Sequence, residues 1–473
     1  MNWKFEDMSM FNKNPRNVQD VSRRLNHVMG PKITEDHHSA HLLLANTPPG
    51  PGYVMDIDRL DYDLDLDKRA HTPDELHVAL RPVLVLAQCF ALMPLYGVTS
   101  PHPKHLRFQW FSIRVLYTCA LCLGSITIVI LSIIRTVNNG ISFLSTVDFV
   151  FFGSSAIVAL LFLKLATEWR DLVDEWGPAE RKIIRIYGSL SNLPNQIRTM
   201  AYTVMALAFA EHVTATATHL ANALPCTNGE WNWRLAEAYY HLAFRQVFSQ
   251  TEVSFWIALP LSVLNLLVTC AWNFMDLFIM VLSVALSARF KQINDKLESV
   301  KAKVMPRWFW RQTRESYNTL SCLTKRLDET LSLIVLLSFA NNLYFICLQL
   351  LNSLKPLRNL WQAIYFVFSF GYLVLRTATV SLFAAHIFDE SKRPVSVLFS
   401  VPSECYCTEV QRFLTQVTSD NLALTGCRFF SVTRTLMLTV AGTIVTYEIV
   451  LVQFNAVNSA DDNSHNLTAN CFM

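Results

Sequence analysis

Ionisable, amide and aromatic side chains interrupt several long apolar stretches of this sequence. Such groups are costly in lipid, so those found there are by default candidates for a functional site. Carboxylates and amides bond to vicinal hydroxyl groups, while Trp and Tyr rings stack on the C–H face of a polyhydroxylated ring. We therefore expect a ligand site built from Asp148, Glu211, His212, Glu252, Trp256, Asn341, Asn342, Trp361, Gln362 and Tyr365.

The same polar groups have a second interpretation. Inside a membrane they also pair with one another or with backbone carbonyls, and such contacts between helices contribute about 0.6 kcal/mol each. For single histidines such as His212 and His219, this structural role is the commoner one. Arg376 lies deeper in its apolar stretch, where we expect it to pair with an acid or to reach the inner interface.

Other chemistries lack a motif in this sequence. No G-x-S-x-G, H-E-x-x-H or P-loop pattern is present, so an enzyme is not expected. Cys405 and Cys407 have no second Cys/His pair at zinc-site spacing, and we predict neither a metal nor another cofactor. A net charge of +3 over 473 residues is too small to favour a nucleic-acid partner.

The composition predicts an all-α membrane protein that positions these side chains on transmembrane helices. Only 16% of the residues are charged, against about 25% in soluble domains. A helix needs about 20 predominantly apolar residues to cross the hydrocarbon core. An apolar stretch of about 14 residues from Pro82 to Leu95 is too short to span and is expected to form an interfacial helix or one packed in the bundle. Seven segments are long enough, namely 110–134, 144–166, 200–222, 254–286, 330–353, 360–387 and 430–455.

Basic residues predict the orientation of these spans. The connections 167–199 and 287–328 are rich in Lys and Arg, whereas 135–143 and the tail after Phe454 are nearly devoid of them. Because basic loops stay in the cytosol, we predict a cytosolic N-terminus and an extracellular C-terminus. The acceptor sequence at Asn466 would then be glycosylated outside the cell. This sidedness is opposite to that of G-protein-coupled receptors.

The fourth and fifth predicted helices continue past the membrane. Leu286, Phe290 and Ile293 begin a heptad seam, and a second stripe runs from Tyr317 to Ile334. These seams pack on each other or on other subunits. The predicted domains are a mostly disordered cytosolic tail 1–74, helices on the ligand side 75–286, a cytosolic helical anchor 287–329, the pore-side helices 330–455 and an extracellular tail 456–473.

Two stretches of sequence resemble insect gustatory receptors of the sugar-sensing branch. The last span reads Thr446-Tyr447, five residues, then Gln453-Phe454, which is similar to the closing motif of that family apart from Glu448 in the variable run. The stretch from Arg81 to Pro94 resembles the segment before the first span in sugar receptors. Asp148 matches an acid in the second span of those relatives.

The resemblance implies a ligand-gated cation channel in the plasma membrane, in which a mono- or disaccharide opens a central pore. Partners would be the sugar, membrane lipid, permeant cations and related subunits in a homotetramer or heterotetramer. The last helix would line the pore, with its gate at Thr446, Tyr447, Gln453 and Phe454. A chemoreceptor for a non-sugar ligand and a secondary transporter remain as alternatives. Cys226 and Cys471 both fall outside the cell in this topology and could pair.

Overall fold

The computed structural model describes residues 75–100, 102–139, 146–227, 232–249, 251–353 and 360–458, although the side chains of 451–458 are not described. These residues fall within one compact unit that begins at Leu66. The predicted tails 1–74 and 456–473 therefore lie, wholly or nearly so, outside the described residues. The same holds for Asn466 and Cys471.

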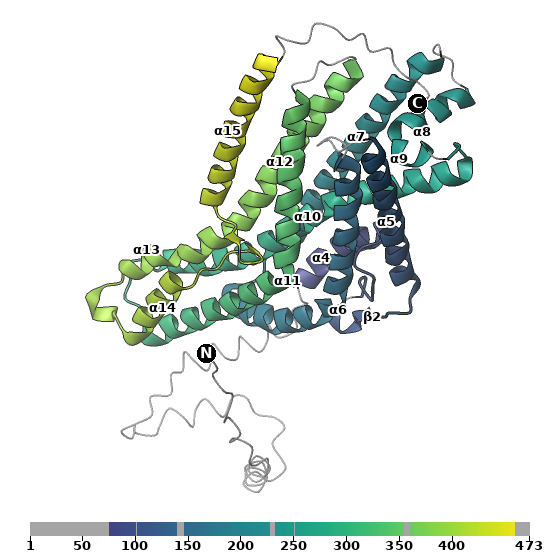
Figure 1. Ribbon diagram of the computed structural model, residues 1–473. Coiled ribbons are helices and arrows are strands. Elements are labelled where there is room, and N and C mark those ends of the chain that lie inside the picture. Colours follow the sequence, from purple (N-terminus) through teal and green to yellow (C-terminus); the bar gives the residue numbers. More distant parts are fainter. Residues whose placement is uncertain are drawn as a thin grey trace, which may run out of the picture. The chain divides into compact units, whose positions relative to one another are not determined.

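Long helices dominate the described chain (Figure 1). In chain order they are α4 (Glu75–Cys89), α5 (Ile113–Asn139), α6 (Val147–Tyr187), α7 (Leu193–Ala223), α10 (Phe255–Ser299), α11 (Arg307–Ser353), α12 (Leu360–Lys392) and α15 (Arg434–Asn458). Short helices connect them: η1 (Pro103–His105), η3 (Leu224–Thr227), α8 (Trp233–Ala243), α9 (Arg245–Phe248), α13 (Pro394–Phe399), η4 (Ser403–Cys405) and α14 (Thr408–Ser419).

Two small antiparallel ribbons complete the described secondary structure. Strand β1 (Leu95–Tyr96) pairs with β2 (Arg107–Phe108), and β3 (Thr425–Gly426) pairs with β4 (Phe430–Ser431). Gly97 follows β1 with a φ of +78°, and a Cβ there would lie 2.1 Å from the carbonyl oxygen of His105. Only glycine therefore fits this close turn.

Five described helices are long and apolar enough to cross a membrane, namely α5, α6, α10, α11 and α12. Helix α7 has 31 residues and α15 has 25, so each is long enough at 1.5 Å per residue to cross the hydrocarbon core, but neither is among those five. The structure thus establishes several apolar helices. The count of seven spans and the orientation of the termini stay predictions.

Helix α10 forms the centre of the bundle. It contacts α4, α5, α6, α7, α11 and α12, and 83% of its most apolar stretch is buried. Phe274 and Phe278 pack on Phe162 of α6 with ring centroids 5.6 and 5.3 Å apart. Helix α15 instead lies at the edge of the described bundle, beside α12 and in contact with α11 (Figure 1).

The segment 167–199, read from the sequence as a loop, is largely helical. Helix α6 continues to Tyr187 and is ended by Gly188 at a φ of +91°. The continuation is stable because Trp169, Val173 and Trp176 form a buried stripe that packs on α4. Arg289 then joins this layer to α10 through ion pairs with Glu180 (2.6 Å) and Glu75 (2.8 Å).

The ends of α10 and α11 beyond the apolar stretches pack together, and other elements join them. Tyr317 of α11 lies 5.6 Å from Phe290 of α10 and 5.3 Å from Phe413 of α14, measured between ring centroids. Its hydroxyl donates to the carbonyl oxygen of Ser391 at the end of α12. The heptad seam is therefore covered within one chain by four helices.

Candidate functional site

A cavity of about 350 Å³ lies among α6, α7, α8, α10, α11 and α12. Four of the predicted site residues line it: Asp148 from α6, Glu211 and His212 from α7, and Tyr365 from α12. Two consecutive helices, α6 and α7, and the distant α12 thus bring these side chains together. His219, about two helical turns after His212 on α7, also lines the cavity.

Glu211 is held in place by a hydrogen-bonded chain across three helices. Ser369 of α12 donates to the Glu211 carboxylate at 2.7 Å, and Gln349 of α11 donates to the Ser369 hydroxyl at 3.3 Å. One carboxylate oxygen of Glu211 accepts this bond, which leaves acceptor capacity for a ligand hydroxyl.

Asp148 stands in the first turn of α6. It makes no hydrogen bond or ion pair among the described residues, although it interacts electrostatically with Arg135 of α5. A carboxylate at the N-terminus of a helix is stabilised there by the helix dipole. Asp148 therefore offers an acceptor that the described hydrogen bonds do not use.

Aromatic rings form another part of the lining. Trp272 of α10 and Phe345 of α11 lie 4.6 Å apart between ring centroids, and Phe151 of α6 meets both rings edge-on. Tyr239 of α8 adds a further ring on the side of His219. The lining of the cavity thus combines hydrogen-bond acceptors with aromatic rings.

Several lining residues were not anticipated from the sequence. Tyr239 and Gln246 come from α8 and α9, in a connection read from the sequence as a loop. Further polar lining comes from Thr216, Asn265, Thr269, Gln349 and Asn352. Asn265 and Thr269 are four residues apart and Gln349 and Asn352 three, a helical spacing that would have placed each pair on one face.

Asn341 and Asn342 do not line this cavity. Asn342 donates to Asp276 at 3.1 Å and accepts from Arg376 at 3.1 Å, deep between α10, α11 and α12. Asn341 is buried beside it, and its side-chain amide nitrogen has no hydrogen-bond partner in the described part of the chain. Arg376 pairs with Asp276 at 3.0 Å, as expected for an arginine at that depth. Both asparagines thus belong to the layer beneath the cavity.

Four other predicted site residues lie away from the cavity. Glu252 is exposed before α10, and Trp256 is 83% exposed in its first turn. Trp361 is half-exposed, and its carbonyl oxygen accepts a hydrogen bond from Thr218 at 3.2 Å. Gln362 is partly buried, and it too is not among the lining residues.

The predicted gate lies on α15. Thr446 donates to the carbonyl oxygen of Gly442 at 2.9 Å, and Thr443 and Thr439 bond back in the same way. Tyr447 is 64% exposed. Gln453 and Phe454 fall within the helix, but their side chains lie outside the described part.

Cys226 is disulfide-bonded, whereas the other described cysteines are free.

Comparisons with known proteins connect this geometry to one family. A family model described as "Trehalose receptor" matches residues 60–464. The chain is 38% identical to the gustatory receptor for sugar taste 64f of Drosophila melanogaster, over 84% of each chain. It is 35% identical to gustatory receptor 5a for trehalose of the same fly, over 80% of this chain and 85% of the relative.

Solved structures show the same fold. The insect olfactory receptor OR5 from Machilis hrabei superposes with a TM-score of 0.60, covering 79% of this chain and 97% of that chain at 15% identity. Its complex with eugenol superposes equally well. The bundle described above is therefore an insect olfactory-receptor-like fold.

Proposed function

Because this chain belongs to the trehalose-receptor family of gustatory receptors, we propose that it binds a sugar and opens a cation channel in response. The membership itself confirms the resemblance seen in the closing motif and before the first span. It also confirms that the chain is a chemoreceptor of the membrane and not an enzyme.

The cavity is the observation that carries the proposal. Its 350 Å³ falls at the lower end of the usual range for small-molecule pockets, a size suited to a mono- or disaccharide. Asp148 and Glu211 would accept hydrogen bonds from sugar hydroxyls, and the amides of Gln349 and Asn265 would bond to others. Trp272 and Phe345 would receive the C–H face of the ring.

A non-sugar ligand is the second candidate, because the same wall of Phe151, Trp272 and Phe345 would accept an apolar ring. The structure of the olfactory receptor OR5 has been solved in complex with eugenol, a ligand of that protein. Two carboxylates in the present cavity favour the sugar, since an apolar ligand would leave them without partners. A secondary transporter would show saturating uptake in place of unitary currents.

Ligand binding would reach the pore through two helices. Helices α11 and α12 both contribute to the cavity wall, and both contact α15. A sugar bonded to α6 and α7 on one side and to Tyr365 or Gln349 on the other would favour one spacing of these helices over another. The open state would then be the one in which α12 and α11 have drawn α15 outward.

The exposed face of α15 supports the proposed assembly of several subunits. Leu438, Val445 and Ile449 are each more than half exposed in the described chain. A tetramer, whether of this chain alone or with related subunits, would place these residues against neighbours and let α15 line a central pore for cations. The chain would be a multi-pass protein of the plasma membrane with its N-terminus in the cytosol.

Currents from cells that express the full chain test the proposal against a panel of mono- and disaccharides. Asp148→Asn keeps the shape of the side chain and removes its charge, a loss of about 1.5–3 kcal/mol for a hydrogen bond to a charged group. The half-effective sugar concentration should rise roughly tenfold or more at unchanged surface expression.

Glu252→Gln is the matched control, because Glu252 is exposed and lies outside the cavity. It should leave the dose–response curve unchanged. Unaltered curves for Asp148→Asn and for Glu211→Gln would remove this cavity as the sugar site. Currents evoked by odorants and by no sugar would replace the sugar with an apolar ligand.

A further inference from the structure

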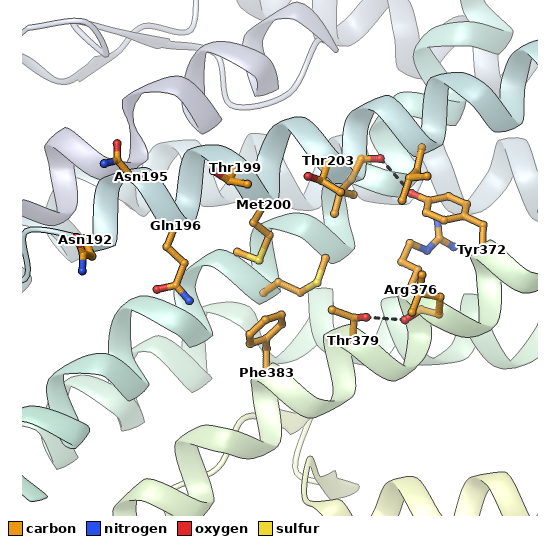
Figure 2. A pocket seen from close by; sticks show the side chains of 14 residues that line it. Asn192, Asn195, Gln196, Thr199, Met200, Thr203, Tyr372, Arg376, Thr379 and Phe383 are labelled. Atoms are coloured by element: carbon orange, nitrogen blue, oxygen red, sulfur yellow. Dashed lines mark hydrogen bonds between the residues drawn. The ribbon is translucent and has the colours of Figure 1, made fainter. Parts of the chain in front are cut away.

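A second and larger cavity opens between α7 and α12, with α10 as its floor (Figure 2). Its volume is about 620 Å³, against about 350 Å³ for the candidate sugar site. The two cavities have different lining residues throughout. The second one is a groove along α7, and the proposed function makes no use of it.

The groove has one polar end. Asn192, Asn195 and Gln196 lie at the start of α7, where their exposed amides line the groove together. Beyond them the walls become apolar, with Met200 and Leu207 from α7, Phe383 from α12 and the buried Met280 from α10. Figure 2 shows the amides at one end and Met200 and Phe383 facing the space further along.

The far end carries a cation that is already neutralised. Arg376 lines the groove, but its guanidinium pairs with Asp276 at 3.0 Å and donates to Asn342 and Asn273. Such a paired charge offers little attraction to an anionic headgroup. Tyr372 closes the same end by donating to the carbonyl oxygen of Val204 on α7 at 3.2 Å. A ligand headgroup therefore belongs at the amide end.

The length of the groove matches half a bilayer. From Asn192 to Leu207 the lining runs along 15 residues of helix, or about 22 Å at 1.5 Å per residue. One leaflet with its headgroup region measures about 20–22 Å. The amide end also lies beside the basic connection that the sequence predicts to be cytosolic.

We infer that this groove holds one acyl chain of a phospholipid of the inner leaflet, with the headgroup at Asn192, Asn195 and Gln196. The polarity gradient, the length and the neutralised far end all fit a membrane amphiphile. Uncharged amides at the mouth select no headgroup charge, so a zwitterionic phospholipid is accepted as readily as an anionic one.

An acyl chain here would touch the layer beneath the sugar cavity. Arg376 stacks on the ring of Trp272 at 4.3 Å, and Trp272 forms the wall of that cavity. The single hydroxyl proton of Tyr372 lies within hydrogen-bond distance of two acceptors, the carbonyl oxygen of Val204 on α7 and the amide oxygen of Asn273 on α10 at 2.9 Å, and so links α12 to both helices. Occupancy of the groove therefore sets the spacing of α7 and α12, the two helices that Glu211 and Ser369 join above.

Photolabelling of the full chain in lipid nanodiscs tests this inference without any sugar. The probe is a phosphatidylcholine with a diazirine in one acyl chain, and the labelled residues are mapped by mass spectrometry. Label should concentrate on residues 196–207 and 375–383. Label spread evenly over the outward faces of α5 and α7 would mean bulk lipid only and would overturn the inference.

Variants sharpen the same measurement. Met200→Trp and Thr203→Trp each fill the groove and should reduce its labelling at least five-fold. Tyr202→Trp, on the same turn of α7 but absent from the lining, should leave it unchanged. Equal labelling in all three folded variants contradicts the inference, as does labelling by a diazirine fatty acid with none by the phospholipid. If a variant with a filled groove does not fold, the distribution of label over the wild-type chain alone tests the inference.

Discussion

At the scale of single residues, the buried polar layer beneath the proposed sugar cavity is built on a hydrogen-bonded ion pair. Arg376 and Asp276 are 3% and 0% exposed, and hydrogen bonds from Ser338 and Asn342 satisfy the remaining acceptor positions of Asp276. A buried pair of this kind gains little net stability over apolar residues, but removing one partner leaves an uncompensated charge.

Arg376→Met should therefore destabilise the chain by about 3–5 kcal/mol. Asp276→Leu alone should be similarly harmful, because Arg376 would lose its counter-charge. The double variant should recover most of the loss, since no charge is then left unpaired. Thermal unfolding of the detergent-purified chain measures all three. A double variant no more stable than the worse single one would contradict this account of the pair.

At the scale of elements, the helices beyond the apolar stretches are held by charged contacts between segments far apart in sequence. Lys392 at the end of α12 donates to the carbonyl oxygens of Val417, in the last turn of α14, and of Asp420, directly after it. A cation at this position satisfies carbonyls that the helix itself leaves unpaired. Lys325 of α11 then bonds the Asp420 carboxylate at 2.9 Å.

This contact makes the region sensitive to acid. Burial alone would raise the pKa of Asp420, but hydrogen bonds from Lys325 and Ser321 outweigh it and lower the pKa below its ordinary value. In the unfolded chain an Asp carboxyl has a pKa of about 3.9. Because the pKa of Asp420 is lower in the folded chain, its ionised carboxylate stabilises the fold at pH values above about 3.9. This stabilisation is lost as the pH falls through the pKa of the folded state.

We expect Asp420→Asn to lower thermal stability at pH 5–7 and to differ less from the wild type below about pH 4. Asp295→Asn is the control, because Asp295 is 55% exposed and its pair with Arg393 is 3.4 Å long. Stability profiles across pH compare the three proteins. A deficit in Asp420→Asn that stays the same at every pH would mean that the charge of Asp420 is not responsible.

The last helix carries the proposed gate. Its threonines bond to their own helix, which satisfies their hydroxyl protons and leaves their oxygens free to accept along a pore. A ring of Gln453 amides could coordinate a cation that sheds water, beside an apolar Phe454 ring that blocks by dewetting.

Gln453→Ala should change basal leak or ion selectivity while sparing the half-effective sugar concentration, because Gln453 lies on α15, which contributes no residue to the lining of the cavity. Single-channel recording at varied cation composition measures this. Wild-type leak and permeability ratios in the variant would place the constriction elsewhere.

At the scale of the whole molecule, the proposed topology places both ends of the chain on defined sides of the membrane. The basic connections predict a cytosolic N-terminus, and the C-terminal tail carries the acceptor at Asn466. Expression in a glycosylating cell should give a mobility shift that a glycosidase removes and that Asn466→Gln abolishes. A C-terminal epitope stained only after permeabilisation would reverse the orientation.

Local patterns in the sequence predicted the helical class, the apolar helices and the family. The apolar stretches are long, and helices satisfy their backbone within one segment, so a span can be read without knowing its neighbours. The closing motif from Thr446 to Phe454 is likewise contiguous. The acids Asp148 and Glu211 stood out because a carboxylate in an apolar run is costly wherever it packs.

Only the tertiary structure decided which of those polar side chains share a cavity. Asn342 and Tyr365 look alike as polar residues in outer half-spans, yet one is bonded to Asp276 and the other lines the cavity. Rotation of each helix about its axis makes that difference, and the packing of six elements sets the rotation. Tyr239 and Gln246 were missed for the same reason: their connection carries no long apolar signal, and only the packing of α8 on α7 and of α9 on α5 brings them to the cavity.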